Sequence, residues 1–285
     1  MASVVEGKGV EPAVWGGNGR EIIFVPYKYS RVVWPESLWD DVSVHDFFLR
    51  RWSSSIAIAI AYVVLIHTAE RWMRDRKAFS LRGPLIIWNS ALALFSLIAT
   101  LRFNEESLFT LSSRPLLHSI CYSVDPRGPA AFWALAFALS KAAELVDTAF
   151  IVLRKRPLIF LHWYHHAVVL VYSWHSAVEL TAAGRWFIGM NYAVHTVMYS
   201  YYAATSAGFR PPKLISMLVT TLQTSQMIIG VLISIAVLAL KLSGTKCQQS
   251  YENLALCFAI YASFAFLFMK FFRSAYLSNG KKKLE

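Results

Sequence analysis

The chain has 285 residues, of which 56% are hydrophobic and only 16% are charged, and its formal net charge is +11. Because ordinary soluble domains carry about 25% charged residues, this composition excludes an ordinary soluble protein and predicts an all-α membrane protein. The basic residues lie in short clusters between apolar runs, which indicates membrane topology and contacts with anionic headgroups or phosphates rather than nucleic-acid binding.

The first 51 residues predict an N-terminal arm at the membrane interface. They are polar and carry Trp15, Trp34 and Trp39, aromatic side chains that favour the headgroup region. They lack the apolar segment of a signal peptide.

Apolar runs long enough to cross a bilayer fill residues 52–277, which we expect to form one transmembrane domain ahead of a basic tail at 278–285. The runs predict seven transmembrane helices, over residues 53–70, 84–101, 130–153, 158–177, 185–207, 214–240 and 252–276. Outside the N-terminal arm, fifteen Lys and Arg residues lie on one side of these helices and six on the other. We therefore expect a cytosolic C-terminus and a luminal N-terminus.

This orientation places Cys121 and Cys247 in loops on the luminal side, while Cys257 lies in the last predicted helix. In an oxidising lumen the two loop cysteines are able to form a disulfide, and two unpaired thiols remain the alternative.

The third predicted helix carries Lys141, Glu144 and Asp147 at successive steps of three residues. A charged side chain at membrane depth costs about 2.5–3.5 kcal/mol on insertion scales, so these groups must be paired or face an aqueous cavity. A purely structural Lys–Glu pair that joins helices is the alternative.

The fourth predicted helix carries His162, His165 and His166, whose spacing places all three imidazoles on one helical face. A single histidine in an apolar helix is usually a satisfied core residue. Three on one face indicate a functional site, because each buried ring needs polar partners.

The fifth and sixth predicted helices add more polar side chains at helical spacing. Asn191, His195 and Tyr199 follow one face of the fifth helix, and Gln223 and Gln226 lie three residues apart on the sixth. Glutamines alone often only join helices. With the charges and histidines, however, they predict one polar chamber inside the helical bundle.

The order and spacing of these motifs resemble the ELO family of fatty acid elongases. The motifs are Lys141-x-x-Glu144-Leu145-x-Asp147-Thr148, Leu153-Arg154-Lys155, His162-x-x-His165-His166, Asn191-Tyr192-x-x-His195-x-x-Met198-Tyr199 and Gln223-x-x-Gln226. The resemblance implies an enzyme of the endoplasmic reticulum that condenses a long-chain acyl-CoA with malonyl-CoA. Such an enzyme releases CO2 and CoA and leaves a 3-oxoacyl-CoA two carbons longer. The resemblance also implies six helices in two inverted three-helix units around a substrate tunnel, with the first helix outside.

Within this resemblance, His165 is the expected nucleophile and would form an acyl-imidazole; a general-base role is the alternative. His162 and His166 would orient it and exchange protons, and His195 with Asn191 would hold the oxyanion or the malonyl group. We expect Lys141, Glu144 and Asp147 to hold this geometry, and Tyr199, Gln223 and Gln226 to line the chamber. No metal or resident cofactor is expected, because the substrates are themselves coenzyme A thioesters.

Basic side chains at the cytosolic mouth are expected to bind the coenzyme A phosphates, although membrane topology explains each of them equally well. The candidates are Arg154, Lys155, Arg156, Arg210, Lys213, Lys270 and Arg273.

The resemblance also implies partners and a location. We expect membrane lipids and the other enzymes of the elongation cycle as partners, and a homo-oligomer is compatible with the family. Lys282 and Lys283 lie fourth and third from the C-terminus, similar to a dilysine retrieval signal, with a tail that binds an anionic leaflet as the alternative. Trp163 stands where members acting on polyunsaturated chains commonly carry Gln, which favours saturated and monounsaturated substrates.

Two other functions are alternatives to an elongase. A membrane di-iron desaturase or hydroxylase also uses His-x-x-His-His, but it needs several such boxes to fill two metal spheres and the chain has one. A seven-helix transporter would explain the intramembrane charges, yet no pair of half-helices broken by Pro or Gly occurs in corresponding positions.

Overall fold

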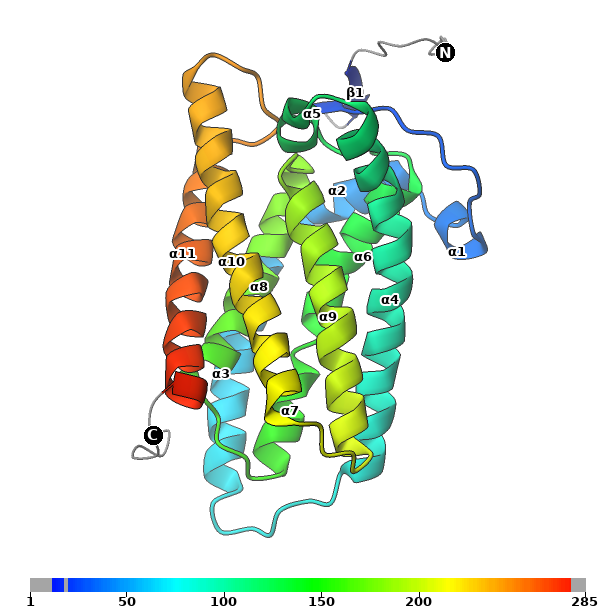
Figure 1. The fold of residues 1–285 in the computed structure, drawn as a ribbon. Coiled ribbons are helices and arrows are strands. Elements are labelled where there is room, and N and C mark those ends of the chain that lie inside the picture. Colours follow the sequence, from blue (N-terminus) through cyan, green and yellow to red (C-terminus); the bar gives the residue numbers. More distant parts are fainter. Residues whose placement is uncertain (1–11, 18–19, 278–285) are drawn as a thin grey trace.

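The computed structural model describes residues 12–17 and 20–277, and the described chain is almost entirely helical (Figure 1). The expected basic tail with Lys282 and Lys283 lies outside the described residues. The short elements are β1 (Ala13–Gly17), β2 (Arg20–Phe24), α1 (Trp34–Ser37), α2 (Asp41–Arg51) and α5 (Leu116–Cys121). The longer helices are α3 (Ser54–Trp72), α4 (Arg82–Ser113), α6 (Pro129–Ala143), α7 (Val146–Leu153), α8 (Phe160–Glu179), α9 (Gly184–Ser206), α10 (Lys213–Leu242) and α11 (Tyr251–Phe272), which a π-helical turn (Arg273–Leu277) extends.

Local sequence signals set several helix ends. Pro129 begins α6 at a position where its missing N–H costs nothing, and the Ser250 side chain caps α11 by accepting from the Asn253 N–H. Gly208 and Gly244 follow α9 and α10 with φ values of +101° and +89°, a left-handed conformation that glycine adopts without steric cost.

Six helices close a ring. Contacts between neighbours run in the order α4, α9, α10, α11, α8, α6 and back to α4, while α3 packs outside against α7 and α8. The N-terminal hairpin and α5 lie at the upper end of the ring in Figure 1, and α11 ends at the lower end. This arrangement agrees with a six-helix barrel that has one helix outside it.

Four helices in the described part of the chain are long and apolar enough to cross a membrane: α3, α4, α10 and α11 with its π-helical turn. The chain is therefore an all-α membrane protein. Each predicted span overlies a helix or a helix pair, but the count of seven spans and the inverted repeat remain predictions.

The third predicted span is two helices rather than one. The backbone N–H groups of Leu145, Asp147 and Thr148 each bond to the carbonyl three residues earlier, so the helix tightens between α6 and α7. Hydrophobic periodicity predicts the apolar segment but not this local change in winding, which alters the directions in which Asp147 and Thr148 project.

The second predicted span continues twelve residues beyond its expected end at 101 and reaches Ser113. The charges in this extension are paired. Arg102 bonds to Glu36 and Glu105, and Glu106 forms an ion pair with Arg185. Pairing allows an apolar helix to carry these groups into the protein interior.

The N-terminal arm packs onto the upper end of the ring. Glu36 of α1 is buried and accepts hydrogen bonds from Arg102 Nε at 2.8 Å and Trp133 Nε1 at 2.7 Å. Burial alone would raise the pKa of the Glu36 carboxyl, but these hydrogen bonds outweigh it and the pKa lies below its usual value. Strand β2 is tied to Ser123, whose N–H donates to Ile23 and whose carbonyl accepts from Val25.

A disulfide joins Cys121 at the end of α5 to Cys247 in the loop between α10 and α11. These are the two cysteines that the sequence predicts on the same side of the membrane. The next residue, Gln248, donates its backbone N–H to the Cys121 carbonyl at 2.8 Å. Cys257 is a free, buried thiol in α11.

Replacing both bridged cysteines, Cys121→Ser with Cys247→Ser, should destabilise the protein by about 2–4 kcal/mol, because the bridge restricts a long loop in the unfolded chain. Thermal unfolding in detergent measures this loss. Reductant should lower the melting temperature of the wild type but not that of the double variant, which serves as the control. Equal melting temperatures for the oxidised wild type and the variant would show that the bridge contributes no stability.

Candidate functional site

The three histidines of α8 line one cavity inside the ring. The His162 and His166 rings lie 4.5 Å apart between centroids, and the His165 and His166 rings lie 5.5 Å apart. His165 also packs on Phe264 of α11, with the ring centroids 4.8 Å apart. The helical spacing therefore brings the three imidazoles together, as the sequence predicts.

Lys141 and Glu144 form a buried ion pair, with Lys141 Nζ 2.7 Å from Glu144 Oε1 and both residues 3% exposed. The ammonium also donates to Asn191 Oδ1 at 3.1 Å, which links α6 to α9. His195 Nδ1 lies 3.8 Å from Glu144 Oε1. The ion pair thus positions Asn191 and His195, the two residues of α9 that are expected to hold the oxyanion or the malonyl group.

Asp147 belongs to a second polar group. Its two carboxylate oxygens accept hydrogen bonds from Trp88 Nε1 at 2.5 Å and from Tyr199 Oη at 2.6 Å. Tyr199 in turn packs edge-on against His195. Asp147 therefore orients Tyr199 and is not part of the Lys141–Glu144 pair, although the sequence spacing groups the three charges.

A chain of hydroxyls supports His162 from outside the ring. Tyr62 Oη of α3 lies 2.6 Å from Thr148 Oγ1, which lies 3.0 Å from His162 Nε2. Thr148 is fully buried and Tyr62 is 6% exposed. The relay fixes the ring orientation of His162. Thr148 stands in the quoted motif, but nothing in the sequence connects Tyr62 to the site.

Two cavities meet at the histidines. The lower cavity, about 390 Å³, is lined by His162, His165, His166 and His195, and the smaller upper cavity, about 90 Å³, is lined by residues of all six ring helices. The residues that line both are His165, Asn191, Gln226 and Met227. Since it is the only one of the four histidines to line both cavities, His165 stands at their junction.

Gln226 offers an unused acceptor at this junction. It is 4% exposed, and its Oε1 has no hydrogen-bond partner in the described structure. Buried side-chain oxygens are normally bonded, so a free one at a cavity wall is available to a ligand. Gln223, by contrast, lines the lower cavity and donates to Met198 Sδ at 3.1 Å.

Of the basic candidates, Arg154 and Arg156 line the lower cavity and extend to a smaller neighbouring hollow. Lys155 instead donates to the Arg74 and Arg76 carbonyls and ties two connections together. The described lining of the lower cavity does not include the other four candidates, Arg210, Lys213, Lys270 and Arg273, which are exposed.

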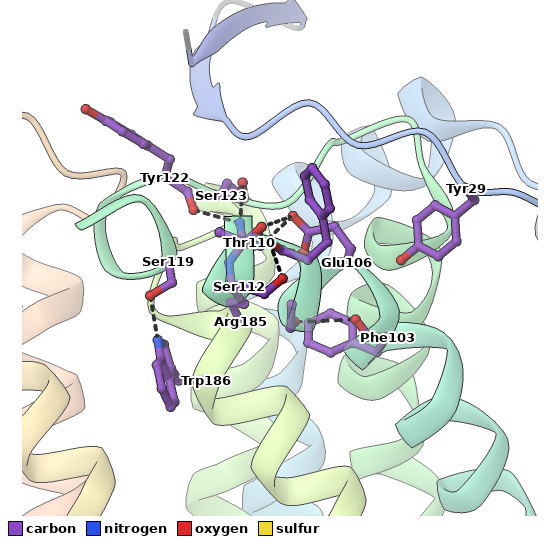
Figure 2. A network of polar contacts seen from close by, with 12 residues as sticks. Tyr29, Phe103, Glu106, Thr110, Ser112, Ser119, Tyr122, Ser123, Arg185 and Trp186 are labelled. Atoms are coloured by element: carbon purple, nitrogen blue, oxygen red, sulfur yellow. Dashed lines mark hydrogen bonds and ion pairs between the residues drawn. The ribbon is translucent and has the colours of Figure 1, made fainter. Parts of the chain in front are cut away.

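The upper end of the ring contains an ion pair that the sequence does not predict. Arg185 lies in the first turn of α9, is 3% exposed and pairs with the fully buried Glu106 of α4 (Figure 2). Glu106 follows the polar residues Arg102, Asn104 and Glu105, so the sequence does not single it out. Its partner could not be read from the sequence, because the two residues are 79 positions apart.

The assembled groups suit acyl transfer: an imidazole at a junction of two cavities, surrounded by oriented donors and an unused amide oxygen. Within the residues that the structure describes, no three His, Cys, Asp or Glu side chains are grouped so that they could hold a metal ion.

Comparison with known proteins places this geometry in context. The profile of the ELO, or GNS1/SUR4, family matches residues 47–284. Putative fatty acid elongase 4 of Caenorhabditis elegans is 48% identical over 271 residues, which cover 95% of this chain and 93% of that protein. Very long chain fatty acid elongase 6 of Drosophila melanogaster is 47% identical over 83% of this chain and 76% of its own length. Very long chain fatty acid elongase 3 of Homo sapiens is 38% identical over 89% of this chain and 94% of its own length.

Replacing Lys141 by Met should destabilise the fold by about 3–5 kcal/mol at neutral pH, because Glu144 is left buried without its cation. Adding Glu144→Gln should restore most of the loss. Thermal unfolding of the single and double variants measures both effects, with Lys246→Met at an exposed lysine as the control. A Lys141→Met protein that melts with the wild type would show that the pair does not hold the site.

Proposed function

The chain belongs to the ELO family and is a condensing enzyme of fatty acid elongation, a 3-oxoacyl-CoA synthase, and we propose that its condensation proceeds through an acyl-imidazole on His165. The observation that supports this proposal is the position of His165 at the junction of the two cavities. Membership of the family decides against the desaturase and transporter alternatives.

The two cavities suit the two parts of an acyl-CoA. We assign the acyl chain to the smaller upper cavity, whose wall includes Phe137, Val169 and Leu180. We assign the coenzyme A portion to the larger lower cavity, where Arg154 and Arg156 offer cations to its phosphates. The thioester then lies where the cavities meet, beside His165. The other basic candidates then contribute to membrane topology and packing rather than to coenzyme A binding; they are Lys155, Arg210, Lys213, Lys270 and Arg273.

In the first step, a ring nitrogen of His165 attacks the thioester carbonyl. The carbon–sulfur bond breaks, and the proton lost from the ring leaves with the coenzyme A sulfur. His162 and His166, whose rings adjoin one another at the cavity wall, orient His165 and pass this proton. The acyl group remains bonded to the ring nitrogen while coenzyme A departs through the lower cavity.

In the second step, malonyl-CoA enters the vacated lower cavity. Loss of CO2 leaves an electron pair on its methylene carbon, which attacks the acyl carbonyl. A carbon–carbon bond forms, the bond to His165 breaks, and the ring takes up a proton from solvent, which balances the charge of the malonyl carboxylate lost as CO2. Asn191, His195 and the free amide oxygen of Gln226 are placed to hold the polar groups of the reactants. No further cofactor takes part in this scheme.

We place the lower end of the ring in the cytosol and the N-terminus in the lumen of the endoplasmic reticulum. The concentration of Lys and Arg in the lower connections and the disulfide at the upper end support this orientation. Membrane lipids and the other enzymes of the elongation cycle are the proposed partners, and saturated or monounsaturated acyl-CoAs the proposed substrates.

The nucleophile can be tested on purified protein given a long-chain acyl-CoA alone and then isotope-labelled malonyl-CoA. The wild type should form an acyl adduct on His165 and then a 3-oxoacyl-CoA two labelled carbons longer. His165→Ala should form no adduct and lose about 10³-fold or more of the condensation rate. His67→Ala, at a half-exposed histidine that lines neither cavity, is the control. Elongation by the wild type without any adduct under rapid quenching would favour the general-base role.

The hydroxyl relay should act on turnover rather than on binding. Thr148→Val removes the group that holds His162 and should lower kcat by about 10- to 100-fold, with little change in the KM for acyl-CoA. Thr148→Ser keeps the hydroxyl and should recover most of the rate. Steady-state kinetics at several acyl-CoA concentrations separate the two constants. Equal loss in the Val and Ser variants would point to packing rather than hydrogen bonding.

A further inference from the structure

We propose that the buried ion pair between Arg185 and Glu106 is the stop that ends the upper cavity and sets the longest acyl chain the enzyme extends. The inference rests on the proposed function, because it takes the upper cavity to be the acyl site. Arg185 and Glu106 take no part in the catalytic scheme proposed above.

The ion pair lies at the far end of the cavity from His165. Along α8, fifteen residues separate His165 from Leu180, and both line the upper cavity. At 1.5 Å of rise per residue this is a path of about 22 Å. Thr181, Gly184 and Arg185 complete the wall at that end, with Ser123 from the connection after α5. An extended chain that starts at His165 therefore points its methyl end at Arg185.

Hydrogen bonds hold the Arg185 guanidinium on several sides. Its Nη1 donates to Glu106 and Thr110 of α4, and its Nη2 donates to the Tyr122 and Ser123 carbonyls at 3.1 and 2.9 Å (Figure 2). One side chain thereby connects α9, α4 and the connection after α5. A hydrocarbon end cannot replace any of these bonds, so it cannot displace the arginine.

The backbone behind Arg185 is also fixed. Ser123 exchanges hydrogen bonds with β2, and Cys121, two residues earlier, carries the disulfide to Cys247. The polar stop is therefore backed by a cross-linked layer. Arg185 Nε has no hydrogen-bond partner among the described atoms, so its polarity is not fully satisfied by the protein and adds to the mismatch with a methyl group.

A second ion pair offers a matched control. Arg102 pairs with the buried Glu36 at the same end of the ring, but neither residue is among those that line the upper cavity. A variant of this pair loses a buried interaction between helix α4 and the N-terminal arm without changing the cavity wall. It separates a general loss of stability from a change in cavity length.

The test compares product lengths from a ladder of saturated acyl-CoAs with labelled malonyl-CoA. Arg185→Ala with Glu106→Ala removes both charges and opens space, so the longest product should gain at least two carbons. Arg102→Ala with Glu36→Ala should retain the wild-type length limit. An active Arg185→Ala/Glu106→Ala enzyme with the wild-type limit would overturn the proposal. Absence of any product from folded wild type would instead overturn the proposed function itself.

A second experiment on the wild type decides the question if the double variant does not fold. The longest accepted acyl-CoA is made with a photoreactive diazirine at its terminal carbon, bound and irradiated. Cross-links are expected on peptides containing Ser123 or the segment from residue 180 to 185. Cross-links confined to peptides of the lower cavity or the outer surface would show that the chain ends elsewhere and would overturn the proposal.

Discussion

The architecture depends on one constraint: charged side chains inside a membrane protein must find partners within the protein. Lys141, Glu144 and Asn191 satisfy one another across α6 and α9, and Asp147 is satisfied by Trp88 and Tyr199. These bonds determine which helix faces meet. They also place His195 and Tyr199 on the wall of the lower cavity, so the interactions that make buried charge tolerable are the same ones that arrange the site.

In the proposed mechanism, the junction of two unlike cavities allows one nucleophile to serve two substrates in turn. The acyl chain can stay in the apolar upper cavity while the first coenzyme A leaves the lower one and the second enters it. The proposed covalent link to His165 would keep the acyl carbonyl in place during this exchange. Without that link, only apolar contacts would retain the acyl group after its coenzyme A portion has left.

The sequence predicts the parts of the structure that follow from periodicity. The helical positions, the shared face of His162, His165 and His166, and the Lys141–Glu144 pair all depend on spacings of three or four residues. The break between α6 and α7 was not predicted, because no Pro or Gly within residues 130–153 marks its tightened turn. The contacts of Tyr62 with Thr148 and of Arg185 with Glu106 were not predicted either, since they join residues separated by 86 and 79 positions. Pairings of this kind depend on the closed ring.

The two ends of the ring use charge in opposite ways. At the upper end, Arg185 and Arg102 pair with carboxylates and donate to backbone carbonyls, so their charges hold this end of the ring together. At the lower end, Arg154 and Arg156 border the cavity, while Lys155 holds the connection that carries them. On the proposed cytosolic side, positive charge is what the topology rule requires, and it is also what a phosphate-bearing substrate requires. One set of residues can therefore set the orientation of the protein and select the side from which its substrates enter.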